Sequence, residues 1–274
     1  KYPLVLIPYP KESNSRYEGM SDEKKAAYFK DMDERWMKDS DNDPLVAEYT
    51  ESSLGKRLRE ITRDDPNTAE IIMTDKYGGL VAASDRISDF YQADEEWWQK
   101  SFANGKGNVF LEQIEFDQSG KTVSIAVAVP IKNALKEVIG VFKNVLESER
   151  LFSPLKKFSI GKSGHIELVG RQGHLIFYSG IKALQSKLPD KAFKKIISQN
   201  SGYLLINETD QLPKKKIGVS YFKIDHPALF KSGIEWWICI VQDADEMFAP
   251  LSGLIFSFVL VALIMVAIVI IIGL

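Results

Sequence analysis

The sequence has one cysteine, Cys239, and three histidines among 274 residues. A single cysteine excludes an internal disulfide and a metal site built from several thiolates. Cys239 lies in the apolar run WWICIV, which indicates a packed thiol. His165 and His174 flank the turn Gly170–Gly173 and would face each other across a hairpin, but two ligands without a third do not make a good metal site. We therefore predict no metal site and no cofactor.

The motifs of common enzyme classes are also missing. The pair Gly78-Gly79 lies between two strand-like runs rather than before a helix, so it does not form a phosphate-binding loop. There is no Gly-x-Ser-x-Gly elbow for a serine nucleophile. Glu95 and Glu96 are adjacent on a predicted helix, where their carboxylates point to different faces instead of converging on one bond. We predict that this region is not an enzyme and has no catalytic residues.

Charge is absent from the last 24 residues, LSGLIFSFVLVALIMVAIVIIIGL (251–274). A helix of this length rises about 36 Å, and the hydrocarbon core of a bilayer is about 30 Å thick. The run predicts a single transmembrane helix, assigned to residues 248–274, with Pro250 in its first turn. The start at Lys1 and the stop at this helix suggest a fragment of a longer protein, and flanking charges do not give its orientation.

The rest of the chain has the composition of a folded protein. Residues 1–150 hold 28 acidic and 21 basic side chains, whereas residues 151–274 hold 9 acidic and 14 basic ones. The basic half is the one next to the predicted span, where anionic lipid headgroups favour positive charge. Its lysine runs are short and lack interleaved aromatic residues, so we predict the membrane, and no nucleic acid, as a partner.

The spacing of apolar residues predicts the secondary structure. Residues 21–37 begin with the helix-capping residue Ser21 and continue as an amphipathic helix, and residues 45–62 resume a helical pattern. A short helix is expected around residues 97–102, within strand-like runs at 69–74, 80–84, 109–116, 122–130 and 138–146. Two strands, a helical insertion and a three-strand meander describe a PAS-like antiparallel sheet.

The same order recurs after a predicted connecting helix at residues 148–158. Strand-like runs fall at 165–169, 174–179, 202–206, 216–223 and 235–242, with a helix at 190–199. We therefore predict an α+β fold of two tandem PAS-like modules on a long N-terminal helix, followed by one transmembrane helix. The predicted parts are an N-terminal region with the long helix (1–65), a membrane-distal module (66–158), a membrane-proximal module (159–247) and the transmembrane helix (248–274).

Three segments carry a resemblance to a known family. TDKYGGLVAASDRISDFYQADEEWWQKSF (Thr74–Phe102) and SIAVAVPIKNALKEVIGVFKNVLESERLF (Ser124–Phe152) look like the distal module of the double-Cache sensor family. KSGHIELVGRQG (Lys162–Gly173) resembles the opening hairpin of the proximal module. The resemblance covers roughly residues 20–274, including the exit into the membrane helix.

The resemblance implies a sensor. Such domains lie outside the bacterial inner membrane, bind small molecules, usually in the distal module, and pass a shift through the transmembrane helix to a histidine kinase, a chemoreceptor domain or a cyclic-dinucleotide enzyme. It also favours a homodimer. We therefore expect a single C-terminal span in the cell (inner) membrane, with the large part of the chain extracytoplasmic.

The resemblance also bears on the ligand. In the amino-acid-binding branch, an Arg two residues before a Trp-Tyr pair holds the ligand carboxylate, and a downstream Asp holds its amine. Here the pair is Trp97-Trp98, the Arg position is Glu95, and the downstream position falls near Asn144 or Val145. A ligand carboxylate would be repelled by Glu95, so we do not predict amino-acid binding.

Five residues are the predicted ligand-binding set: Tyr91, Asp94, Glu95, Trp97 and Trp98. Aromatic faces beside carboxylates suit a cation or a flat heterocycle, so the predicted ligand is a small polar or cationic metabolite. Neighbouring residues on a helix point about 100° apart, so one tryptophan is expected in the core and the other at the pocket. Asp94 is equally expected to do no more than cap the short helix.

Two other classes of function stay open at this point. A membrane-anchored enzyme of the cell envelope would need a convergent catalytic set. An adhesion module would expose a large apolar patch in place of a closed pocket.

Overall fold

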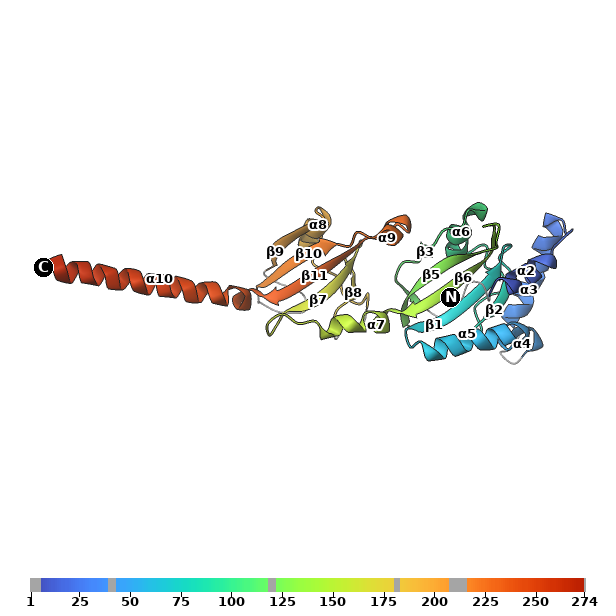
Figure 1. The fold of residues 1–274 in the computed structure, drawn as a ribbon, viewed down its shortest axis with the longest axis horizontal. Helices are drawn as coiled ribbons and strands as arrows, with labels where there is room; N and C mark the ends of the chain where they lie inside the picture. The colour runs from blue at the N-terminus through green and yellow to red at the C-terminus, as the bar shows by residue number, and fades with distance from the viewer. Residues whose placement is uncertain (1–5, 39–42, 118–121, 180–182, 207–215, 274) are drawn as a thin grey trace. The chain divides into compact units, whose positions relative to one another are not determined.

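The computed structural model describes residues 6–38, 43–117, 122–179, 183–206 and 216–273, which form an α+β protein (Figure 1). They divide into two compact units, the first made of Lys1–Ser153 with Asp225–Glu235 and the second of Pro154–Ile224 with Trp236–Leu274. Each unit is built on one antiparallel sheet. The predicted fold class is confirmed, while the predicted boundaries between the parts stay a prediction.

The sheet of the first unit has the order β2-β1-β6-β5-β3, and β4 also pairs with β5. Two expected strands, at 122–130 and 138–146, are confirmed as the long pair β5 and β6. The expected strand at 109–116 is instead split into β3 and β4, which pair with different stretches of β5. The strands are β1 (Thr68–Asp75), β2 (Leu80–Ala83), β3 (Phe110–Leu111), β4 (Glu115–Asp117), β5 (Thr122–Lys132) and β6 (Val138–Glu147).

The expected helix at 21–37 is confirmed as α3 (Asp22–Lys38), and the Oγ of Ser21 accepts the N–H of Lys24 at 3.4 Å. The helical pattern expected over 45–62 is confirmed, but it is divided into two helices by a break at residues 51–52. The structure has α4 (Pro44–Thr50) and α5 (Ser53–Asp64), because Ser52 accepts the N–H of Gly55 and starts a new helix. The other helices of this unit include α2 (Pro8–Ser15), α6 (Glu96–Phe102) and α9 (Pro227–Lys231).

The two faces of this sheet pack against different helices. On one face, Ile72, Ala128 and Val141 lie in a core cluster with residues of α3, α4 and α6. We call this the α6 face. On the other face, Ile71 and Met73 pack against Leu54 and Leu58 of α5 and, more loosely, against α2. The alternation of side chains along β1 explains why consecutive residues enter different cores.

Asp75 ties the β1–β2 hairpin together and connects it to α2. Its carboxylate accepts the N–H groups of Tyr77 (2.8 Å) and Gly79 (3.1 Å) and the hydroxyl of Ser13 (2.8 Å). The side chain is fully buried, and this burial raises the pKa of Asp75 to about 6 although the hydrogen bonds act against it. Asp75 therefore shapes the turn and also holds α2 against it.

The second unit repeats the architecture with the strand order β8-β7-β11-β10-β9. Its strands are β7 (His165–Gly170), β8 (Leu175–Phe177), β9 (Ser201–Ile206), β10 (Ile217–Lys223) and β11 (Trp236–Asp243), and α8 (Asp190–Ile197) packs on the sheet. Cys239 is fully buried in this core, and burial raises the pKa of its thiol to about 12. The thiol is packed and unreactive, as expected.

The predicted connecting helix at 148–158 is wrong in its extent. The chain forms α7 (Ser148–Leu151) and a separate 3-10 helix, η2 (Ser153–Lys157). Pro154 has no N–H to donate to the carbonyl four residues earlier, so a regular α-helix cannot continue through it.

The apolar segment forms α10 (Ala244–Gly273), which is long and apolar enough to cross a membrane over the described stretch Ala244–Val266 (Figure 1). The side chains of residues 251–266 are exposed within the chain. The helix starts earlier than predicted, so Pro250 lies inside it rather than in its first turn. Because β11 ends at Asp243, strand and helix follow each other without a linker.

Candidate ligand-binding site

The predicted site lies in the insertion between β2 and β3, which α3 holds against the sheet. The carboxylate of Asp33 accepts the N–H groups of Phe90 (2.8 Å) and Tyr91 (2.7 Å), and the indole of Trp36 donates to the carbonyl of Ile87 (2.8 Å). Burial raises the pKa of Asp33, and Asp89 adds to the rise more weakly. An acidic residue on α3 therefore fixes the backbone on which the predicted aromatic and acidic residues are arranged.

Both tryptophans of α6 are buried, Trp97 to 1% exposure and Trp98 to 7%. The indole N–H of Trp98 donates to the hydroxyl of Thr74 at 3.0 Å, and its ring stacks on Phe102 with centroids 4.6 Å apart. Both tryptophans are therefore buried, and the expectation that one of them lines a ligand pocket stays a prediction. Both belong to the core of the α6 face, because each indole finds its partners there.

Lys143 is the residue that sequence reasoning missed. Its register partner in β1 is Ile72, which places it on the α6 face. The Nζ atom lies 4.9 Å from the centre of the Trp97 ring and 3.1 Å from a carboxylate oxygen of Glu112, and the side chain is only 14% exposed. An internal cation thus occupies an aromatic and acidic environment of the kind predicted for a ligand cation. The alternation of β6 was the available signal, because it puts Lys143 beside Val141 and Val145.

Two of the predicted residues, Asp94 and Glu95, lie in a cluster of carboxylates with Asp89. One oxygen from each of the three lies within 4.8 Å of the others, an arrangement that could hold a metal ion. Burial raises the pKa of Glu95, followed by the negative charges of Asp89 and Asp94, whereas Lys143 lowers it. The cluster is exposed enough for a cation to reach, and it lies directly before α6.

Tyr91, the fifth predicted residue, is half-buried beside α3. Its ring lies 4.7 Å from that of Phe29 at a tilt of 31°, and burial raises the pKa of its phenol, with Asp94 the next contributor. The structure therefore brings Tyr91, Asp94 and Glu95 toward one electrostatic neighbourhood. The ammonium group of Lys143 lies over the ring of Trp97 and lowers the pKa of Glu95, so it links Trp97 to these residues. Trp98 instead donates its indole N–H to Thr74.

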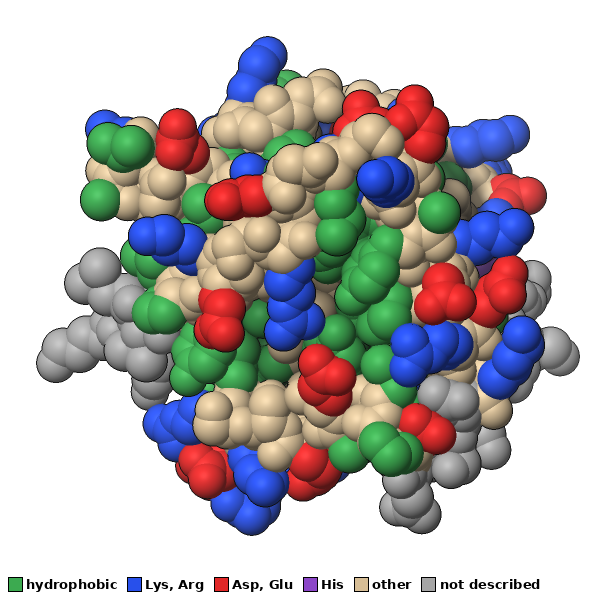
Figure 2. Space-filling model, turned by 90° about the vertical axis from the view of Figure 1, so that its right-hand side faces the viewer, with side chains coloured by type: hydrophobic (Ala, Val, Ile, Leu, Met, Phe, Trp, Pro, Cys, Tyr) green, Lys and Arg blue, Asp and Glu red, His purple; other side chains and the backbone are tan. Residues whose placement is uncertain are grey.

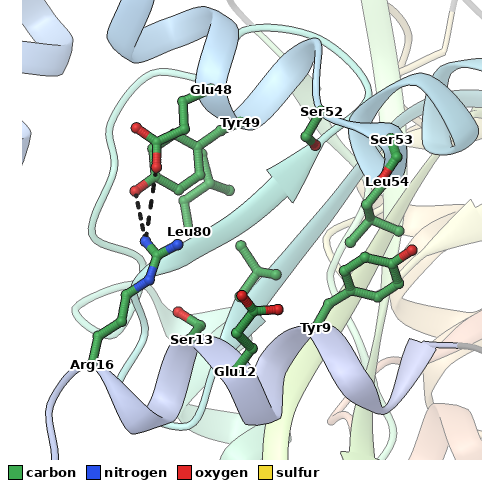
Figure 3. Close-up of a pocket in the computed structure, with 11 residues that line it drawn as sticks. Tyr9, Glu12, Ser13, Arg16, Glu48, Tyr49, Ser52, Ser53, Leu54 and Leu80 are labelled. Atoms are coloured by element: carbon green, nitrogen blue, oxygen red, sulfur yellow. Dashed lines mark hydrogen bonds and ion pairs between the residues drawn. The ribbon is translucent and has the colours of Figure 1, made fainter.

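A small cavity of about 130 Å³ lies elsewhere in this unit, between α2, α4, α5 and β2 (Figure 3). Arg16 reaches across it toward Tyr49 (3.5 Å) and Glu48 (3.9 Å). Ligand sites usually hold roughly 300–1,000 Å³, so this space suits a few water molecules rather than a metabolite. Figure 2 looks onto the end of the first unit where α2 and α3 lie in Figure 1, and it shows hydrophobic side chains in a hollow bordered by acidic and basic ones.

A larger cavity of about 400 Å³ lies in the second unit and includes His165, Glu167 and Tyr178 in its lining. None of the five predicted residues lines either of these two cavities. The expectation that His165 and His174 face each other is wrong: Gly170 donates to the carbonyl of His174 across the hairpin, which puts His165 far along β7. The useful signal was instead the spacing of His165 and Glu167, since residues two apart on a strand share a face.

Comparison with known proteins places this architecture in a family. A model of the Cache domain matches residues 20–251. The methyl-accepting chemotaxis protein TlpA of Bacillus subtilis (strain 168) is 26% identical over 148 residues, which are 52% of this chain and 22% of that protein. The chain thus spans about a fifth of the length of that curated relative.

Solved structures share the fold at low sequence identity. The ligand-binding domain of the Pseudomonas fluorescens chemoreceptor CtaA, in complex with L-alanine, is 16% identical with a TM-score of 0.50, covering 87% of this chain and 99% of that one. The sensory domain of the Campylobacter jejuni chemoreceptor Tlp3 is 15% identical with a TM-score of 0.50, covering 89% and 95%. The extracellular domain of rpHK1S-Z16, assigned to the histidine kinases, is 15% identical with a TM-score of 0.53, covering 90% and 94%.

At such identities the structural likeness establishes the fold and not a shared ligand. The family match covers most of the chain, and the two consecutive antiparallel sheets repeat the architecture of these sensor domains. The chain therefore belongs to the Cache domain family, as a double-Cache sensor region.

Proposed function

We propose that this chain is the extracytoplasmic ligand-sensing region of a transmembrane signalling receptor, with α10 as its membrane span. Membership of the Cache family supports a sensor, and the apolar helix that follows β11 directly supports a single anchor. A histidine kinase, a chemoreceptor or a cyclic-dinucleotide enzyme is the proposed output, and this region itself has a binding rather than a catalytic role. A homodimer is part of the proposal, and multi-angle light scattering of the chain in detergent would test it.

We further propose that the first unit binds a small polar or cationic metabolite next to α6. The observation that carries this proposal is the cluster of Asp89, Asp94 and Glu95, whose oxygens lie within 4.8 Å of one another. Three carboxylates at this distance repel each other, and a bound cation relieves the repulsion while it gains charge-assisted hydrogen bonds. The pKa of Glu95 is raised mainly by burial, and the repulsion from Asp89 and Asp94 adds to the rise.

Lys143 gives the proposed site a built-in competitor. Its ammonium group already lies over Trp97 and near Glu112, so an incoming amine can take over those contacts if the lysine side chain moves. Such an exchange would shift β6, the central strand that pairs with both β1 and β5. Ligand binding would thereby act on the core of the sheet rather than on a surface loop.

Isothermal titration of the full chain tests the ligand class. The panel consists of putrescine, adenine, L-alanine, acetate and calcium chloride, and the variants are Glu95→Gln and Lys143→Met. Putrescine or adenine is expected to bind, at least about tenfold more weakly to Glu95→Gln, because one charge-assisted contact is lost. Lys143→Met is expected to bind putrescine more tightly, because the competing cation is gone.

Two outcomes would overturn the ligand proposal. Tight binding of acetate alone would show that the site prefers an anion. Binding of calcium with no organic ligand would show that the carboxylates form a metal site. Glu137→Gln is the matched control, since Glu137 lies in the exposed turn before β6, where its carboxylate contacts Asn133.

A further inference from the structure

The cavity of about 400 Å³ in the second unit is large enough for a metabolite. It lies over the face of the second sheet that carries the core of this unit, and strands β7, β8, β9, β10 and β11 all contribute to it. Its walls are mostly apolar, with Leu175, Leu188, Ile217, Val219 and Val241 among them. The cavity therefore offers a hydrophobic enclosure above the middle of the sheet.

The polar side chains that line this cavity include the β7 pair His165 and Glu167, together with Gln185, Ser186 and Lys187. Glu167 lies on β7, is only 8% exposed, and has the buried Cys239 as its register partner on β11. The Nε2 atom of His165 lies 3.3 Å from Oε1 of Glu167, and its Nδ1 atom lies 3.1 Å from the carbonyl oxygen of Ser163. Both ring nitrogens thus face acceptors, and both hydrogen bonds form only when each nitrogen carries a proton. The imidazolium form of His165 is accordingly favoured, and the hydrogen bond to Glu167 raises the pKa of His165.

At the His165–Glu167 pair, the hydrogen-bonding sites that remain available to a ligand are acceptor sites. Both donors of His165 are engaged, whereas a carboxylate offers about four lone-pair sites and His165 takes one of them at Glu167. The ring of Tyr178 lies 5.0 Å from that of His165 and forms an adjacent aromatic wall. Lys187 also lines the cavity, and its side chain is exposed. A ligand carboxylate would meet Glu167 without a free donor on His165, while an amine would meet an acceptor and an aromatic face.

We propose that this cavity is a second ligand site of the chain, for a small molecule that carries one protonated amine on an apolar body, with Glu167 as the anion that receives the amine. The apolar body lies against Val219, Val241 and Leu175 in the interior of the cavity. The amine donates to acceptor sites of Glu167 that His165 leaves unused. This site is independent of the one proposed next to α6.

Amine binding is coupled to a proton. An ammonium group beside Glu167 repels the imidazolium of His165, so His165 releases its proton when the ligand binds. The charged and titratable groups that face His165 are Glu167 on β7, Asp243 on β11 and Tyr178 after β8. The two carboxylates favour the proton on His165, and the phenol of Tyr178 stays neutral because burial raises its pKa. Affinity for an amine therefore rises as pH increases through the pKa of His165.

The same contacts connect the cavity to the start of α10. Ser163, whose carbonyl faces His165, donates its N–H (3.0 Å) and its hydroxyl (2.6 Å) to Glu246 of α10, and the N–H of Lys162 donates to Glu246 at 2.6 Å. The hydroxyl of Ser163 also accepts the N–H of Asp243 at 3.0 Å. Deprotonation of His165 weakens its hydrogen bond to the carbonyl of Ser163. Ligand binding in the cavity therefore acts on Lys162 and Ser163, which hold Glu246 at the start of α10.

Isothermal titration of the full chain in nanodiscs with phenethylamine, and with hydrocinnamate as the acid of matching shape, tests the proposal. The expected result is binding of phenethylamine, preferred over hydrocinnamate, with an affinity that rises between pH 5.5 and 8. The released proton is taken up by the buffer, and phosphate and Tris have different heats of protonation. The binding enthalpy measured in phosphate is therefore expected to differ from that measured in Tris. Glu167→Gln is expected to weaken binding at least about tenfold.

Two further variants keep the test decisive. Val219→Phe fills the cavity from β10 and is expected to abolish phenethylamine binding, even if Glu167→Gln fails to fold. Glu95→Gln alters only the first unit and is expected to leave this binding and its pH dependence intact. No binding of phenethylamine at millimolar concentration, binding that survives Val219→Phe in a folded chain, or a preference for hydrocinnamate would overturn the proposal.

Discussion

Ionisation of the buried Asp75 is expected to destabilise the first unit as pH rises. The Asp75→Asn variant is expected to lack this pH-dependent loss of stability. The pKa of Asp75 is about 6 in the folded chain against an ordinary value of 3.8, and its carboxyl is fully buried. A folded-state pKa above the unfolded value means that the folded chain binds the proton more tightly. The free energy of unfolding therefore falls by about 3 kcal/mol as pH rises from about 4 to about 6. Above pH 6 this contribution stays constant.

Asparagine keeps the contacts that hold the hairpin. Its Oδ1 can accept the N–H groups of Tyr77 and Gly79, and its amide can donate to the hydroxyl of Ser13. The variant loses only the charge, so its stability relative to the wild type is expected to rise by about 3 kcal/mol between pH 4 and pH 6.5. Taking the difference between the two proteins cancels the other titrating groups that they share.

Guanidinium unfolding in detergent, followed by tryptophan fluorescence at several pH values, measures this difference. The exposed Asp64→Asn, at the end of α5, is the matched control and is expected to give a much flatter difference. A difference between wild type and Asp75→Asn that does not change with pH would refute the reasoning. A difference that changes with pH in the opposite direction would show that the three hydrogen bonds stabilise the ionised Asp75 by more than burial destabilises it.

Three smaller perturbations test the packing. Trp98→Phe removes the donor to the buried hydroxyl of Thr74 and is expected to lower the free energy of unfolding by about 1–3 kcal/mol, measured by guanidinium unfolding. Gly78→Ala is expected to cost about 2 kcal/mol or more in thermal melts, because φ is +90° and the new Cβ would lie 2.3 Å from the Cβ of Ala93. Glu246→Gln is expected to speed hydrogen exchange of the two backbone N–H groups that its carboxylate accepts, measured by mass spectrometry.

Neighbouring positions supply the controls. Gly105 also has a positive φ (+81°), but a Cβ added there would meet nothing within 4 Å, so Gly105→Ala isolates backbone strain from the clash at Gly78. Asp245→Asn changes an adjacent exposed carboxylate and is expected to leave the exchange near Glu246 unchanged. Equal effects of Gly78→Ala and Gly105→Ala, or of Glu246→Gln and Asp245→Asn, would contradict the packing argument.

Local patterns were enough to predict most elements of the fold. Alternating apolar residues gave β1 and β6 within one or two residues, and Ser21 marked the start of α3. The pattern was insufficient where one polar contact ended an element. The bond from Gly55 to Ser52 separates α4 from α5, and Pro154 separates α7 from η2. Such contacts change the path of the chain without changing the apolar periodicity.

The candidate site was predictable only in part. The acidic residues Asp94 and Glu95 are close in sequence, so their proximity follows from the chain itself. Lys143 meets Trp97 only because α6 packs on the face of the sheet to which Lys143 points, and no local signal contains that packing. The burial of both tryptophans likewise depends on partners distant in sequence, such as Thr74.

The sequence by itself determined the α+β fold and the apolar C-terminal helix, because periodicity and hydrophobic length are properties of neighbouring residues. The sensor role was implied by the resemblance to the double-Cache family. Only the tertiary structure decided which distant groups meet: Lys143 with Glu112, and Ser163 with Glu246 at the start of α10. The physical reason is that strand register and the packing of the insertion bring together side chains whose separation along the chain carries no information about their contact.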